Sequence, residues 1–62
     1  MLYRVVLIFA DTNSLAAFIE HIEVSGEVSN REYSFVGNLA EEQIKEARTS
    51  FGAYVRVLRK LE

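Results

Sequence analysis

The spacing of apolar residues changes repeatedly along this chain of 62 residues, and the order of those changes constrains the fold more than any motif. Residues 2–9 form an apolar run, residues 12–24 carry apolar side chains at helical spacing, and residues 27–36 are extended in character. Helical spacing returns over residues 39–51, and residues 54–61 alternate. This order predicts a small α+β protein in which helices pack on one sheet.

The first strand and the first helix are the clearest of these elements. Apart from Arg4, residues 2–9 are β-branched, aromatic or otherwise apolar on both faces, which is typical of a central strand. The polar residues 11–14 follow, and their side chains accept hydrogen bonds from the free N–H groups at a helix start. The predicted helix carries one apolar stripe, formed by Leu15, Phe18, Ile19 and Ile22. Gly26 is predicted to end this element.

A polar cluster at residues 29–32 divides the next extended segment and has the composition of a turn. We therefore predict a hairpin, with a short edge strand at residues 24–29 and a central strand at residues 32–37. If residues 27–36 instead form one strand, the chain is a three-stranded βαβαβ unit.

The last two elements are a helix and an edge strand. Asn38 is predicted to begin the helix, and Gly52 is predicted to end it. The expected buried stripe of this helix consists of Ala40, Ile44, Ala47 and Phe51. The strand at residues 53–60 carries three basic residues, as edge strands often do.

The preferred order, βαββαβ, is that of a ferredoxin-like two-layer sandwich, with an antiparallel sheet and both helices on one face. We assign residues 1–60 to this single domain. Leu61-Glu62 is also the dipeptide that a cloning site before a purification tag leaves behind, so nothing is based on these two residues.

Composition excludes several ways of stabilising so small a core, which by itself rarely supplies more than about 3–5 kcal/mol. The chain has no cysteine, so it has neither disulfides nor thiolate metal ligands, and its single histidine makes a zinc site implausible. Oligomerisation is the remaining remedy. The apolar run at residues 2–10 is too short to span a membrane and lacks the features of a signal peptide. We expect a cytoplasmic location.

The polar residues do not assemble a catalytic site, and we expect neither enzymatic activity nor a cofactor. Asp11 and His21 lie at opposite ends of the first predicted helix, so they cannot act as a pair within one chain. His21, which lies near Glu20 and Glu23, is expected to be solvated or paired with a carboxylate.

Two helices cover only one face of a sheet, so the other face is exposed unless a partner binds it. The pattern allows either face of the first strand to be the covered one. In one arrangement the helices cover the side chains of Tyr3, Val5, Leu7, Phe9, Tyr33, Phe35, Val55 and Val57. The exposed face is then apolar and presents Leu2, Val6, Ile8, Val36, Tyr54 and Leu58. We expect this face to bind a protein partner, most simply a second copy in a homodimer.

The opposite arrangement favours a different function. Residues 31–36, Arg-Glu-Tyr-Ser-Phe-Val, resemble the octapeptide on the third strand of the RNA-recognition motif, a family that also has βαββαβ order. The resemblance implies single-stranded RNA binding, in which Tyr3, Tyr33 and Phe35 stack on bases and Arg31 meets a phosphate. Glu32 departs from the family glycine, and Asn38 stands where the family has an aromatic residue. A net charge of −2 also argues against a broad basic face.

A third hypothesis is a regulatory module that binds a small ligand at a dimer interface.

Overall fold

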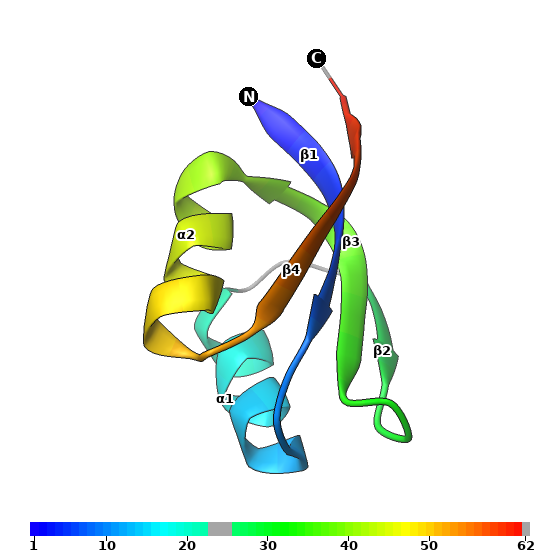
Figure 1. Ribbon diagram of the computed structural model, residues 1–62, viewed down its shortest axis with the longest axis vertical. Helices are drawn as coiled ribbons and strands as arrows, with labels where there is room; N and C mark the ends of the chain where they lie inside the picture. Colours follow the sequence, from blue (N-terminus) through cyan, green and yellow to red (C-terminus); the bar gives the residue numbers. More distant parts are fainter. Residues whose placement is uncertain (23–25, 62) are drawn as a thin grey trace.

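The computed structural model describes residues 1–22 and 26–61. Its elements, in chain order, are β1 (Leu2–Ile8), α1 (Thr12–Ile22), β2 (Glu27–Ser29), β3 (Ser34–Ala40), α2 (Glu41–Ser50) and β4 (Tyr54–Lys60). The four strands form one antiparallel sheet in the order β2-β3-β1-β4, with both helices on the same face (Figure 1). The predicted ferredoxin-like α+β sandwich is confirmed, and the three-stranded alternative is wrong.

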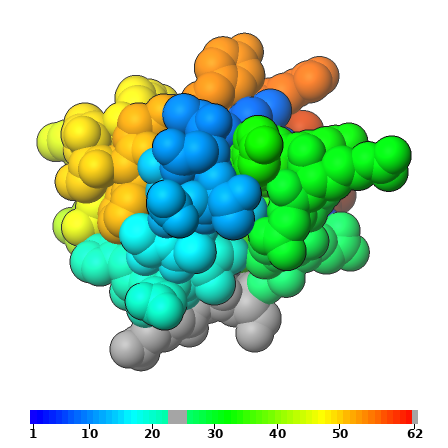
Figure 2. All heavy atoms as spheres, turned by 90° about the horizontal axis from the view of Figure 1, so that it is seen from below, coloured from blue at the N-terminus to red at the C-terminus, as the bar shows by residue number. Residues whose placement is uncertain are grey.

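The apolar strands β1 and β3 occupy the middle of the sheet, and the more polar strands β2 and β4 occupy its edges, as the sequence predicts. Seen from one end of the molecule, the end of β1 (blue) lies between the β2–β3 hairpin (green) and the start of β4 (orange) (Figure 2). The pairing of β1 with β4 is irregular at one point. Val5 stands opposite Val57, whereas Arg4 stands opposite Arg59, so Leu58 is the extra residue of a bulge.

Asp11 caps α1, as the polar run predicts. Its Oδ1 accepts a hydrogen bond from the backbone N–H of Ser14 at 2.8 Å. This bond to the ionised carboxylate, together with a second from the Ser14 side chain, holds the pKa of Asp11 below its ordinary value. The residues just before the predicted helix end at Gly26, and the predicted start of the edge strand at residue 24, lie outside the described residues.

The boundary between β3 and α2 corrects the prediction that Asn38 begins the helix. The strand continues to Ala40, because Asn38 and Ala40 pair with Arg4 and Leu2 at the start of β1. Leu39 then points into the core and is fully buried. The helix begins at Glu41, and its first free N–H, that of Ala40, donates to Oε1 of Gln43 at 2.9 Å.

The other end of α2 agrees with the sequence. Phe51 is the last residue with helical backbone geometry, and Gly52 follows with a φ of 67°. Left-handed backbone of this kind is common where a helix ends, and glycine adopts it without steric cost. Tyr33 also has a positive φ, of 55°, because it closes the turn between β2 and β3. It was predicted to lie within the central strand under the helices, and that prediction is wrong.

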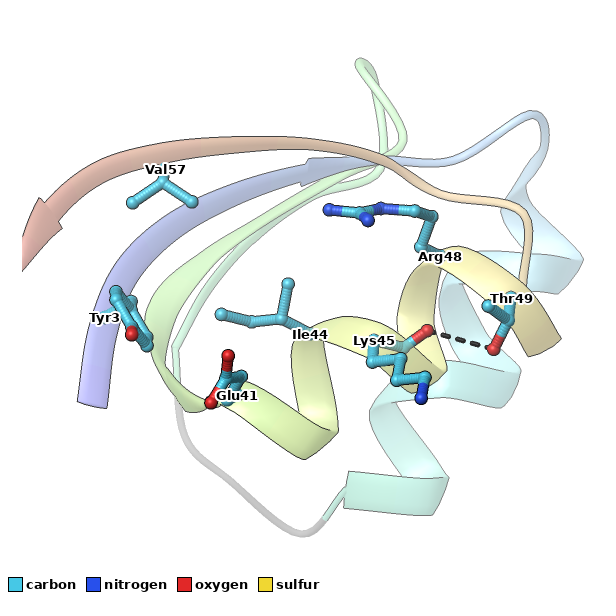
Figure 3. Close-up of a pocket in the computed structure, with 7 residues that line it drawn as sticks. All are labelled: Tyr3, Glu41, Ile44, Lys45, Arg48, Thr49 and Val57. Atoms are coloured by element: carbon cyan, nitrogen blue, oxygen red, sulfur yellow. Dashed lines mark hydrogen bonds between the residues drawn. The ribbon is translucent and has the colours of Figure 1, made fainter. Parts of the chain in front are cut away.

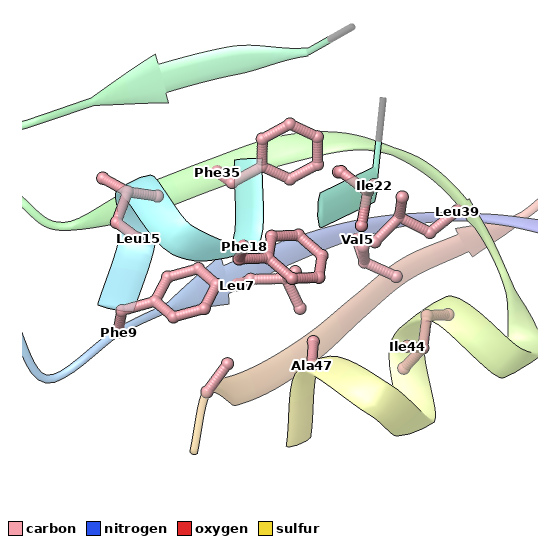
Figure 4. Close-up of a cluster of buried hydrophobic side chains, with 11 residues drawn as sticks. Val5, Leu7, Phe9, Leu15, Phe18, Ile22, Phe35, Leu39, Ile44 and Ala47 are labelled. Atoms are coloured by element: carbon pink, nitrogen blue, oxygen red, sulfur yellow. The ribbon is translucent and has the colours of Figure 1, made fainter. Parts of the chain in front are cut away.

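Aromatic packing dominates the core between the sheet and the helices (Figure 4). The ring of Phe18 lies at its centre, 5.4 Å from the ring of Phe9, 5.9 Å from that of Phe35 and 5.4 Å from that of Phe51. Edge-to-face and tilted contacts of this kind add to the free energy of burial. Phe9 and Phe35 come from the sheet layer, and Phe18 comes from α1, so the cluster fixes which face of the sheet is covered.

Candidate interaction surface

The face of the sheet opposite the helices, called the bare face below, carries alternate residues of each strand. Neither helix of the described chain lies on it (Figure 1). The strand register arranges its side chains in rows that cross the sheet. The row nearest the β2–β3 turn, called the hairpin row, consists of Ser29, Ser34, Ile8 and Tyr54. The central row consists of Glu27, Val36, Val6 and Arg56. The row nearest the chain termini, called the terminal row, consists of Asn38, Arg4 and Arg59.

The residues predicted to form an interface lie on this face or at its margin. Four of them are large apolar side chains with substantial exposure: Leu2 (44%), Ile8 (43%), Tyr54 (66%) and Leu58 (48%). Val6 and Val36 lie between them in the central row and are half-buried. An exposed apolar cluster that crosses strands in this way is the usual mark of a binding surface.

The bare face is also more polar than the sequence predicted, since it carries three arginines. Arg4 and Arg59 stand directly opposite each other on β1 and β4, where like charges repel. The Nη1 of Arg4 donates to Oδ1 of Asn38 at 3.3 Å. Arg56 lies at the β4 end of the central row, and Glu27 lies at the β2 end. The central row therefore has a basic end and an acidic end, separated by the side chains of Val6 and Val36.

This charge pattern was not predicted, because it depends on strand register rather than on sequence spacing. Arg56 and Glu27 are 29 positions apart in the chain, and only the pairing of β4, β1, β3 and β2 places them in one row. The one available signal was the alternation of Arg4, Val6 and Ile8 along β1, which places a charge on the same face as two apolar residues.

The residues implied by the RNA-recognition motif do not share a surface. Phe35 is fully buried against Phe18 under the helices. Tyr3 also packs on the core side of the sheet and is half-buried. Tyr33 and Arg31 lie in the turn between β2 and β3. Base stacking requires aromatic rings on an open sheet face, and here the covered face is the one that holds Tyr3 and Phe35.

His21 pairs with a carboxylate, which confirms one of its two expected environments. Its Nε2 lies 2.9 Å from Oε2 of Glu46, and its ring is 5.6 Å from that of Phe51. The pair links α1 to α2. Both side chains are nearly half exposed, so the contribution of the pair to stability is about 0–1 kcal/mol. Within residues 1–22 and 26–61, no three acidic, histidine or cysteine side chains cluster as metal ligands would.

A second candidate site is an open groove of about 400 Å³ between α2 and the strands β1 and β4 (Figure 3). Tyr3, Ile44 and Val57 form its apolar part. Glu41, Lys45, Arg48 and Thr49 provide the remaining lining. The hydroxyl of Thr49 donates to the backbone carbonyl of Lys45 at 3.0 Å, so it is already engaged. The lining carries both signs of charge and no paired nucleophile and base, and this gives the groove no defined chemistry.

Comparison with known proteins adds no assignment. No protein-family model, curated protein or solved structure matches this chain. The fold and the bare face therefore define the protein as a small ferredoxin-like α+β domain. No helix in the described part of the chain has both the length and the apolar character needed to cross a membrane.

Proposed function

We propose that the protein is a non-enzymatic interaction module that self-associates through the bare face. One observation carries the proposal: four large apolar side chains, each more than 40% exposed, lie on or beside a sheet face that neither helix covers. Water contact with such a surface is unfavourable, and burying it contributes about 25 cal/mol per Å². The same face would also accept a different protein, but a second copy is the simplest partner.

The size of the molecule agrees with a dimer of this kind. Its extents are 31 × 20 × 19 Å, so one broad face presents about 600 Å² in projection. A stable interface buries about 800 Å² of accessible surface on each partner, and accessible area exceeds projected area. A domain of 62 residues has a small core, so dimerisation would add to its stability as well as supply its function.

Sedimentation velocity over tens to hundreds of micromolar tests the proposal. We expect the wild-type protein to sediment at about twice its chain mass of 7.1 kDa. Val6→Glu places a charge at the centre of the bare face and should give a folded monomer. Leu58→Glu should act in the same way, and it is the safer variant because Leu58 is more exposed than Val6.

Val28→Glu is the matched control for these variants. Val28 is an exposed valine on β2, but it pairs with Phe35 and so faces the helix side of the sheet. This variant should remain dimeric. A wild-type chain that is monomeric at hundreds of micromolar would exclude self-association, and equal loss of dimer in Val28→Glu and Val6→Glu would exclude the bare face.

A further inference from the structure

The central row of the bare face is complementary to itself when reversed. It reads Glu27, Val36, Val6 and Arg56 from β2 to β4, so an acid and a base stand at its ends with two valines between them. A second copy of the row, turned end for end, would place base over acid at both ends and valine over valine in the middle.

The hairpin row is also complementary to its own reversed copy, in the size of its side chains. Its β2–β3 half carries the small side chains of Ser29 and Ser34, and its β1–β4 half carries the large side chains of Ile8 and Tyr54. When this row is reversed onto itself, large side chains meet small ones. In the terminal row, Arg4 of β1 would then meet the amide of the partner's Asn38 rather than another arginine.

Two sheets that pack face to face can be related by a twofold axis along the strands or across them. An axis across the strands places β4 of one copy over β4 of the other, which brings Arg56 over the partner's Arg56 and Glu27 over the partner's Glu27. An axis along the strands places β4 over the partner's β2, and each row then meets its own reversed copy. Charge and size both favour the second arrangement.

We infer that two copies pack bare face on bare face about a twofold axis parallel to the strands, with Arg56 beside the partner's Glu27 and Val6 beside the partner's Val36. This inference rests on the proposed self-association and specifies its geometry. Aligned packing of two twisted sheets leaves an angle of about 30° between their strands, so the contacts closest to the axis are the most closely matched.

Charge exchange tests this geometry. Glu27→Arg and Arg56→Glu each convert two attractive contacts per dimer into repulsive ones, so each should weaken the dimer by roughly tenfold in dissociation constant. The double variant, Glu27→Arg with Arg56→Glu, restores opposite charges at both contacts. We expect its dissociation constant to return to within about threefold of the wild-type value. Both residues are exposed, so circular dichroism should show an unchanged fold.

The outcomes separate this inference from the proposal beneath it. A wild-type monomer excludes both. A wild-type dimer that Val6→Glu dissociates, but whose charge-exchanged double variant is no tighter than the single variants, retains the bare face and overturns the orientation. If Arg56→Gln, which removes the charge without adding another, tightens the dimer, the like charges of β4 meet across the interface, and the axis runs across the strands instead.

Discussion

The two faces of this sheet are built from the same strands and differ in what their alternate residues do. On the covered face, Leu7 of β1 stands beside Phe35 of β3, and both are fully buried under the aromatic ring of α1. One residue further along, Ile8 stands beside Ser34 on the bare face and is 43% exposed. The covered face has the close apolar packing that a fold requires. The bare face has exposed apolar residues and charges arranged in a row, which is why we propose that the interaction occurs there.

The largest expected contrast between the faces comes from truncating one apolar side chain on each side. Phe18→Ala empties the centre of the aromatic cluster and should cost about 3–5 kcal/mol, which is close to the whole stability of a domain of this size. Ile8→Ala removes a half-exposed side chain and should cost about 1 kcal/mol or less in the free monomer.

Urea unfolding followed by circular dichroism at several protein concentrations measures both variants. Self-association through the bare face adds a concentration-dependent part to the cost of Ile8→Ala, because the dimer stabilises the folded chain. If Ile8→Ala destabilises as much as Phe18→Ala in dilute protein, the two faces do not differ in the way described.

A smaller effect is expected at two glycines that are special for different reasons. A Cβ on Gly26 would lie 2.5 Å from the ring of Phe35 and 2.6 Å from the backbone oxygen of Val36, so Gly26→Ala must displace both a buried side chain and strand backbone and should cost about 1–3 kcal/mol. A Cβ on Gly52 would meet nothing within 4 Å, and Gly52→Ala should cost only the backbone strain of its positive φ, about 1 kcal/mol.

Thermal unfolding of the two glycine variants gives the comparison directly. The additional substitution Phe35→Leu, which removes the ring, should relieve part of the cost of Gly26→Ala, because the contact with the Val36 backbone oxygen remains. It should leave the cost of Gly52→Ala unchanged. Equal costs of Gly26→Ala in both backgrounds would show that the Phe35 ring contributes nothing to that cost.

The smallest expected effect is a pH dependence from Asp11. Its pKa is lowered in the folded state, so the charged cap contributes stability that is fully present above the ordinary aspartate pKa of about 4. That stability is lost as the pH falls through the lowered folded-state pKa. We expect Asp11→Ala to lower the melting temperature at pH 7, and the difference from wild type to shrink in acid.

Asp11→Asn is the control, because asparagine caps a helix without a titrating charge. Its melting temperature should lack this acid-dependent part. Since α1 lies on the covering side of the sheet, both Asp11 variants should leave the sedimentation behaviour at pH 7 unchanged. A melting-temperature difference between Asp11→Ala and wild type that is constant from pH 7 to pH 2 would contradict the charged cap.

Much of the fold could be predicted from local patterns, and the wrong helix start at Asn38 has a cause outside them. The Asp11 cap, the Gly52 helix end and the edge position of β4 follow from residue types near each site. The β3–α2 boundary does not. Residues 38–40 have no strong strand signal, and they remain extended because the start of β1, some 36 residues earlier, pairs with them.

The candidate site divides in the same way. The alternation in β1 predicted two possible sets of apolar residues, but it could not select between them, because both faces of that strand are apolar. The aromatic cluster around Phe18 makes the selection by burying Phe9 and Phe35. The position of Glu27 and Arg56 at the two ends of one row could not be predicted, because it follows from the register of three strand pairs at once.

The most direct test of the bare face is an isotope-filtered NMR experiment on a mixture of labelled and unlabelled protein, which detects contacts only between different copies. We predict cross-peaks between copies from the methyl groups of Val6, Ile8 and Val36 on the bare face. Val28 and Val57, whose strand partners lie on the helix side, should give none. Cross-peaks confined to Val28 or Val57, or none from any methyl group at hundreds of micromolar, would contradict the account.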